Sequence, residues 1–199
     1  MTKSFLEAVK ARRSYYGINK DQVISDDQIV KLVQDAVNFT PSSFNSQSSR
    51  VLVLLGDKHD QLWDITTETL RAVVPAESFG PTEEKMSAFK SGYGTVLFFE
   101  DNAVVEGLQK GFPAYADNFP KWSDQSSGML QFVVWTLLEN EGLGASLQHY
   151  NPLIDEQVKK TWNVPDSWRL MSQMPFGKPI SQPGDKEFQP IDTRVKVYK

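Results

Sequence analysis

The chain has 199 residues, of which 40% are hydrophobic and 23% charged, and its net charge is −4. These values are ordinary for a globular protein, and we expect a single domain spanning residues 1–199. A mildly acidic chain has no field that gathers nucleic acid or anionic lipid, so neither is an expected partner. The absence of cysteine excludes disulfides, thiolate nucleophiles and cysteine-ligated metals.

The sequence shows no targeting or membrane signal. Residues 1–13 are charged throughout and lack the apolar stretch of a signal peptide. The longest aliphatic run, residues 51–55, is far shorter than the roughly 20 residues that cross a bilayer. We therefore expect a cytoplasmic protein that does not bind membranes.

A serine followed three residues later by Glu or Gln opens each of the first two predicted helices. The first begins after Ser4 and ends near residues 12–14. The second begins after Ser25, carries an apolar stripe over residues 29–37, and ends before Pro41.

The middle of the chain alternates strands and helices. Residues 51–55 and 95–99 are continuous apolar runs, which are typical of buried strands. Helices are predicted over residues 58–73 and 82–90. The segment 101–123 is mixed and aromatic, and its pattern assigns no element to it.

The longest predicted helix covers about residues 126–141 and ends at Gly142. A short strand at 145–147, an amphipathic helix at 153–162 and a strand at 168–174 follow. Strands that alternate with helices predict an α/β or α+β layered domain.

The C-terminal tail lies beyond the last predicted helix. Residues 188–198 are extended and apolar in places, and residues 195–197 are a candidate edge strand. Such a segment can pair with a sheet edge, in its own chain or in a partner chain, or it can be a loosely attached terminus. The sequence alone leaves these alternatives open.

Several familiar chemistries leave signatures that this chain lacks. There is no G-x-G-x-x-G after a strand, no Walker loop and no G-x-S-x-G elbow. His59 and His149 are far apart and have no ligand cluster around them, so we expect no metal site.

Three polar stretches remain as candidates for binding. Residues 12–14 (Arg-Arg-Ser) can grip a phosphate, or can form a solvated helix end. The loop 41–47 is dense in amides and hydroxyls that can read the edge of a heterocycle, or it can be an ordinary connection. Gly177 and Lys178 can place a cation beside an anion, although a lysine in a turn is usually only solvated.

Together these stretches resemble the nitroreductase family, and in particular its short subgroup, which includes a copper-induced bacterial nitroreductase and a yeast fatty-acid-repression protein. The matching motifs are R-x-S at residues 12–14, P-S-S-x-N-x-Q at 41–47, G-x-G-A at 142–145 and a basic residue within 175–179. The run 91–101 resembles the short subgroup. Each motif is weak alone, but their order and spacing match the family over nearly the whole chain.

The resemblance implies an α+β nitroreductase-like fold, with a central, mostly antiparallel sheet flanked by helices. It also implies a homodimer in which each C-terminal tail crosses to the partner. Two FMN sites would lie at the interface and take residues from both chains.

The resemblance assigns roles to particular residues. Arg12, Ser14 and Lys178, with Gly177 beside it, would hold the FMN phosphate end, and Arg13 would lie near the ribityl chain or ring. Asn45 and Gln47 of the polar loop would face the ring edge. Ser42 and Ser43 would reach in from the partner chain. The backbone at Leu147, Gln148 and His149 would lie close to the reactive flavin nitrogen.

The sequence departs from the family pattern in two places. Many members carry a lysine near the flavin pyrimidine edge where this chain has Tyr16, and Lys85 or Lys90 would supply the charge instead. The chain is also short for the helical excursion that covers the site in larger relatives. An aromatic stretch would cover the site in place of that excursion. It would contact substrate through Phe112, Tyr115, Phe119 and Trp122.

The implied activity is hydride transfer from NADH or NADPH through FMN to nitroaromatic or quinone acceptors, in a ping-pong scheme. The cofactor carries this chemistry, so no catalytic side chain is expected. A second hypothesis is a flavin-bound redox sensor or regulator, linked to the stress response or lipid metabolism, with little turnover.

Overall fold

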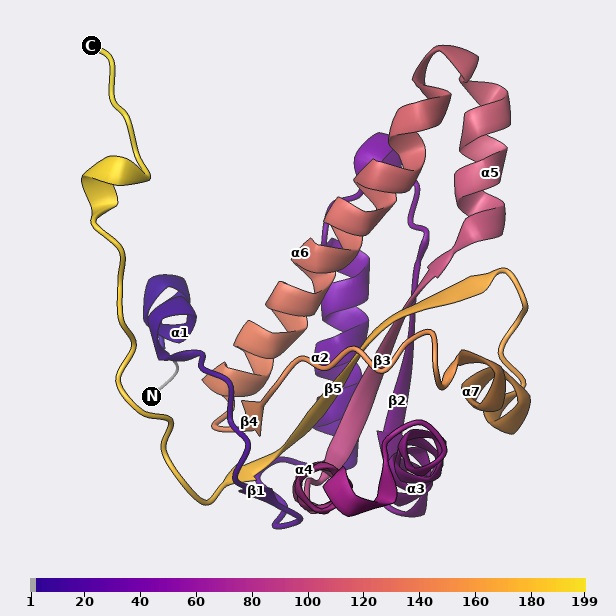
Figure 1. Cartoon of the computed structure of the whole chain (residues 1–199). Helices are drawn as coiled ribbons and strands as arrows, with labels where there is room; N and C mark the ends of the chain where they lie inside the picture. The colour runs from indigo at the N-terminus through magenta and orange to yellow at the C-terminus, as the bar shows by residue number, and fades with distance from the viewer. Residues whose placement is uncertain (1–2) are drawn as a thin grey trace.

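The computed structural model describes residues 3–199 (Figure 1). Over this range the α-helices are α1 (Phe5–Ala11), α2 (Asp26–Phe39), α3 (Asp57–Arg71), α4 (Gly80–Lys90), α5 (Asn102–Gly111), α6 (Phe119–Asn140) and α7 (Asp155–Trp162). The strands are β1 (Ile18–Asn19), β2 (Ser49–Leu55), β3 (Gly94–Asp101), β4 (Gly144–Ala145) and β5 (Trp168–Pro179). Short 3-10 turns lie at Ser43–Asn45, Ala76–Ser78, Pro113–Asn118 and Ile191–Thr193.

The strands form one sheet in the order β1-β5-β3-β2, with β4 also paired to β5. Every strand pair is antiparallel. This confirms the expected α+β fold with an antiparallel sheet and flanking helices. β5 is the central strand, and β2 is paired on one side only, with β3.

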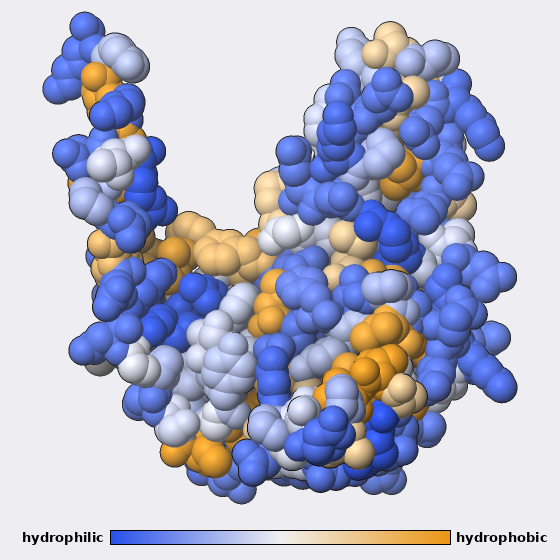
Figure 2. Space-filling view, viewed as in Figure 1, coloured by the Kyte–Doolittle hydropathy of each residue, from blue (hydrophilic) through white to orange (hydrophobic). Residues whose placement is uncertain are grey.

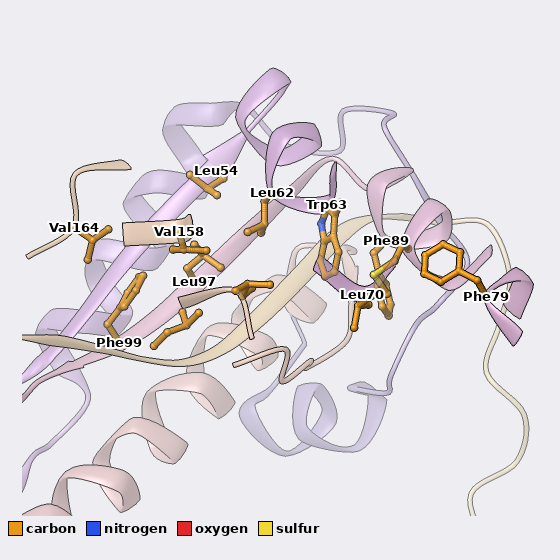
Figure 3. Packing of buried hydrophobic residues seen from close by; sticks show 13 residues of the cluster. Leu54, Leu62, Trp63, Leu70, Phe79, Phe89, Leu97, Phe99, Val158 and Val164 are labelled. Carbon is orange, nitrogen blue, oxygen red and sulfur yellow. The ribbon is translucent and has the colours of Figure 1, made fainter. Parts of the chain in front are cut away.

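Two cores lie on opposite faces of the sheet, because successive side chains of a strand point to opposite faces. On β3, Leu97 and Phe99 join the core that packs against α3, α4 and α7 (Figure 3). Val96 and Phe98, on the same strand, join the core under α2 and α6. All four side chains are at most 1% exposed.

A buried polar chain lies between α3 and β3. Trp63 Nε1 donates to Thr95 Oγ1 at 3.0 Å, and the hydroxyl lies 2.8 Å from His59 Nδ1. The other ring nitrogen, Nε2, lies 3.2 Å from the Lys90 carbonyl, which only accepts, so Nε2 carries the proton. Burial lowers the pKa of His59 to about 4, and the ring is neutral at neutral pH.

The two capping boxes form as predicted. Ser4 and Glu7 exchange hydrogen bonds at the start of α1, and Ser25 and Gln28 do so at the start of α2. The predicted helices and strands appear at their expected places, with most boundaries shifted by a few residues.

Four expectations require correction. The unassigned segment 101–123 contains α5, and α6 begins at Phe119, two turns before the predicted start, because polar Ser123, Ser126 and Ser127 are buried and interrupt the apolar stripe. β2 is a half-buried edge strand where the apolar run predicted a buried one. β5 extends to Pro179.

After β5 the tail turns back past α1 and then extends away from the body of the chain (Figure 1). Residues 195–197 form no strand within the single chain, and Val195 and Val197 are 54% and 70% exposed. Among residues 3–199, no helix has the length and apolar character needed to cross a membrane.

Candidate functional site

A cavity of about 540 Å³ lies where the end of α1 meets the first part of the tail. Among the described residues that line it there are three cations and no carboxylate. The lining residues are Arg12, Arg13, Ser14, Tyr15, Tyr16, Gly17, Ser181, Gln182, Pro183, Gly184 and Lys186. Guanidinium, ammonium and hydroxyl donors around one cavity suit a phosphate.

The backbone after α1 is fixed by β4. Tyr15 N donates to the Ala145 carbonyl at 2.9 Å, and Ser14 pairs with Ala145 in an isolated parallel bridge. Gly144 allows this close approach, because a Cβ there would lie 2.8 Å from the Tyr15 side chain. The structure thus brings the first motif and the G-x-G-A turn together.

The tail closes the other side of the cavity. Arg13 Nη2 donates to the Gly184 carbonyl at 2.6 Å, and Tyr15 Oη donates to Gln182 Oε1 at 3.3 Å. Both contacts hold residues 181–186 beside α1.

Arg12 is the more enclosed of the two arginines. Its guanidinium carbon lies 4.4 Å from the centroid of the Trp135 ring on α6, which fixes its position. Burial, and then the neighbouring Arg13, lowers the pKa of Arg12, but an arginine remains charged near neutral pH. The charge is therefore held on a rigid aromatic face at the wall of the cavity.

Lys178 does not line this cavity. It lies on β5, paired with Asn19 of β1, and its Nζ contacts Asp21 Oδ2 at 3.0 Å. Gly177 has a packing role, because a Cβ there would lie 2.5 Å from the Asn19 carbonyl oxygen. In the single chain it is Lys186, and not Lys178, that lines the cavity with Arg12, and the predicted contact of Lys178 with the FMN phosphate stays a prediction.

The two lysines considered as substitutes at Tyr16 also lie outside the cavity lining. Lys90 Nζ pairs with Asp64 Oδ1 at 2.6 Å. Lys85 Nζ lies 5.7 Å from the centroid of Phe89, whose ring is 6.2 Å from that of Tyr16. Tyr16 itself lines the cavity and is 54% exposed.

The segment 147–149 follows β4 directly. Gln148 is buried and exchanges two backbone hydrogen bonds with Gln173 of β5, at 2.7 and 2.9 Å. Leu147 packs on the core under α6, and His149 is exposed. This short segment therefore has a fixed backbone and presents one open side chain.

The polar loop and the aromatic stretch lie together at the other end of α6. Phe44 of the loop has its ring centroid 5.0 Å from that of Phe112 and 5.9 Å from that of Tyr115. The Phe44 centroid is 5.2 Å from Phe119 and 6.1 Å from Trp122. The four aromatic residues predicted to contact substrate therefore form one cluster around Phe44.

Within one chain, the two halves of the predicted site are far apart (Figure 1). Arg12 contacts Trp135, and Phe44 contacts Phe119, which is 16 residues earlier on α6 (135 − 119). That spacing corresponds to about 24 Å of helix axis. Ser42, Ser43, Asn45 and Gln47 are thus gathered with the aromatic cluster, and not with the cationic cavity.

Sequence reasoning missed the tail residues that line the cavity, and Lys186 in particular. Lys178 stands in the turn that resembles the family motif, on β5, where its backbone pairs with β1. Lys186 lies in the chain after Pro179, which turns back along α1.

Known proteins that resemble this chain over most of its length are nitroreductases. The nitroreductase family model matches residues 9–178. The nitroreductase FRM2 of Saccharomyces cerevisiae is 35% identical over 199 residues, which cover 99% of this chain and 98% of FRM2. HBN1 of the same yeast is 36% identical over 194 residues, or 96% of each chain.

Among solved structures, nitroreductase CinD from Lactococcus lactis in complex with nicotinic acid has a TM-score of 0.93 and 45% identity, covering 98% of this chain and all of CinD. CinD has also been solved with 4-nitrophenol, in a structure that superposes with a TM-score of 0.91. The agreement of motifs, fold and relatives over almost the full length shows that the chain belongs to the nitroreductase family.

Proposed function

We propose that this protein is an FMN-dependent oxidoreductase that transfers hydride from NADH or NADPH to nitroaromatic or quinone acceptors. The observation that carries the proposal is the cavity with three cations at the end of α1, in a chain of the nitroreductase family. Its donor set fits the phosphate end of FMN, since Arg12, Arg13 and Lys186 supply charge and Ser14 supplies a hydroxyl. The complexes of CinD with 4-nitrophenol and nicotinic acid support the substrate class.

The side chains and backbone of the protein bind FMN and orient its ring. FMN, when bound, supplies two-electron redox chemistry, so that donor and acceptor can react in turn at one ring face. Arg12 and Lys186 hold the phosphate. Gln148 fixes the backbone through its two hydrogen bonds to Gln173, so that the following amide, that of His149, faces the ring. Cations and amide donors that are fixed before reaction stabilise negative charge on the reduced ring. No acid or base side chain is required for this role.

The site is completed by a second copy of the chain. Asn45 and Gln47 lie at the far end of α6 from Arg12, so a site that contains both groups draws them from two chains. The space-filling view shows the tail and the α5–α6 hairpin separated by open space, which a partner would fill (Figure 2). Exposed apolar side chains on α1 and α6 face solvent in the single chain, namely Phe5, Leu6, Met129 and Phe132.

We propose that the C-terminal tail of the partner chain binds along the edge of β2. A groove of about 630 Å³ between β2 and α2 is lined by Val30, Val51 and Val53. In the tail, Val195 and Val197 alternate with charged residues, which is the pattern of a strand with one apolar face. Strand addition at the free edge would cover the groove and tie the two chains together.

A flavin-bound sensor linked to stress or lipid metabolism is the alternative function. The two differ in turnover. Initial rates measured with NADH and a nitroaromatic both varied should give parallel double-reciprocal lines for the proposed ping-pong enzyme. Turnover too slow to measure with either nicotinamide would favour the sensor and overturn the enzyme. A cytoplasmic location is part of the same proposal.

Substitution of Arg12 by alanine should weaken FMN binding far more than substitution of Arg13. Arg12 is held against Trp135 and directed into the cavity, whereas Arg13 already binds the Gly184 carbonyl. A charge-assisted contact with phosphate contributes about 1.5–3 kcal/mol, or roughly a 10- to 150-fold change in Kd. Titration of the apo-protein by flavin fluorescence measures both variants, and equal, small losses would show that Arg12 does not hold the phosphate.

His149→Ala should retain most of the rate of hydride transfer from NADH. The side chain is exposed, and the segment contributes to the site through its backbone, which Gln173 fixes. Stopped-flow reduction of the flavin, followed by reoxidation with a quinone across pH, tests this. A large fall in the rate of reoxidation, with the rate of reduction by NADH unchanged, would identify His149 as a proton donor.

A further inference from the structure

A fully buried carboxylate lies next to the residue that follows the polar loop, and it has no part in the proposed hydride transfer. Glu100 is near the end of β3 and is 0% exposed. A buried carboxylate is costly unless hydrogen bonds replace the water that it loses. Its surroundings therefore show what it holds in place.

Three serine hydroxyls donate to Glu100. Ser48 Oγ and Ser123 Oγ each lie 2.6 Å from Oε2, and Ser49 Oγ donates to Oε1. Separations of about 2.5–2.7 Å are typical of charge-assisted bonds between a hydroxyl and a carboxylate. The donors come from three places: Ser48 follows the polar loop, Ser49 begins β2, and Ser123 is on α6. Glu100 thus joins the end of the loop to α6.

The middle of the same loop is joined to the same turn of α6 by an aromatic contact. Phe44 stacks on Trp122, with ring planes 19° apart and centroids 6.1 Å apart. Trp122 directly precedes Ser123, so the two attachments lie side by side on the helix. Arg50 attaches the loop to β3 as well. Its Nη1 donates to the Gln47 carbonyl at 2.7 Å, and its Nη2 pairs with Asp101.

The loop needs these attachments because its backbone is strained. Among the described residues, four that are not glycine have positive φ, and three of them lie here: Phe44 at 58°, Asn45 at 49° and Gln47 at 49°. Such a conformation costs of order 1–3 kcal/mol per residue and persists only where the surroundings enforce it. Within the loop, Asn45 N donates to the Ser42 carbonyl, Ser46 N to the Ser43 carbonyl and Gln47 N to Ser42 Oγ, so each of these bonds stays inside the strained segment.

We propose that Glu100 is a positioning residue for the flavin-facing loop. Its carboxylate holds Ser48 against α6 and so keeps residues 44–47 in the conformation that presents the Asn45 and Gln47 amides. This inference rests on the proposed FMN site, in which those amides meet the ring edge. Glu100 touches neither cofactor nor substrate.

The test substitutes Glu100 by glutamine, which keeps the shape but replaces one acceptor oxygen with an NH₂ group that cannot accept from serine. Hydrogen exchange of the amides at residues 45–47 should become at least tenfold faster. FMN affinity of the apo-protein should fall about tenfold, and the visible spectrum of the bound flavin should move toward that of free FMN. His59→Gln is the matched control, because it changes a buried hydrogen-bonded group on the other face of the sheet and should leave all three readouts unchanged.

The results separate the possibilities. Unchanged exchange at residues 45–47 in Glu100→Gln, or faster exchange with unchanged FMN affinity and spectrum, would overturn the proposal. If Glu100→Gln does not fold, Ser123→Ala removes one of the three hydroxyls and should show the same changes at smaller size. A wild-type protein that binds no FMN would overturn the proposed function, and exchange at residues 45–47 would still decide whether Glu100 orders the loop.

Discussion

Removal of residues 187–199 should convert the protein into a monomer and weaken FMN binding at least a hundredfold. The deletion keeps Lys186 in the cationic cavity but removes the apolar residues of the tail. Without a tail to cover the β2 edge, the partner's loop would no longer meet the cavity. Obligate interfaces bury roughly 2,000 Å² or more, so loss of the crossing segment should not be tolerated. Sedimentation and flavin titration of the truncated chain measure the two effects.

Point substitutions provide the matched control. Val195→Asp with Val197→Asp places charge on the apolar side of the tail and should reproduce the truncation. Lys196→Asp alters the opposite side of the same segment and should leave the dimer intact. A wild-type, flavin-loaded monomer of 22.5 kDa would contradict the shared site directly, as would a truncated chain that still sediments as a dimer.

Acidification from pH 6.5 to pH 4 should cost the fold about 3 kcal/mol through His59 alone. Burial lowers its pKa in the folded chain to about 4, from the ordinary histidine value of 6.5. Between these values the unfolded chain binds a proton that the folded chain does not. Stability is therefore complete above pH 6.5 and falls as the pH falls, at up to about 1.36 kcal/mol per pH unit.

His59→Gln isolates this contribution from that of the carboxylates. Glutamine can accept from Thr95 and donate to the Lys90 carbonyl, but it does not titrate. Denaturant unfolding across pH should show a stability difference between wild type and variant that changes by about 3 kcal/mol over this window and is constant outside it. A difference that does not depend on pH would show that His59 is not held neutral in the folded chain.

Local signals in the sequence predicted most elements because local chemistry determines them. The capping boxes at Ser4 and Ser25, the apolar runs of β2 and β3, and Gly142 after α6 act within a few residues of where they stand. Antiparallel pairing followed from the family resemblance, and the fold confirms it. The sequence did not predict α5, which buries only Val105 and so has no stripe of buried apolar residues. It placed the start of α6 too late, because the buried Ser123 interrupts the apolar pattern and its hydroxyl donates to Glu100 of another element.

The candidate site was less predictable, since it depends on contacts between distant segments. Arg12 and Ser14 were identified from a motif, and the structure places both in the cavity. The family motif predicts that Lys178 holds the FMN phosphate; in the single chain its backbone pairs with β1 and its ammonium group contacts Asp21. Lys186 enters through the path of the tail, which carries no periodic pattern.

The central claim is that the bound flavin accepts hydride from a nicotinamide and passes it on. The most direct measurement mixes the FMN-loaded protein with NADH without oxygen, and then adds a nitroaromatic, while the visible flavin absorbance is followed. The account predicts rapid loss of that absorbance and rapid recovery on addition of the acceptor. Absorbance that persists with both NADH and NADPH, or that does not recover when a nitroaromatic or a quinone is added, would contradict it.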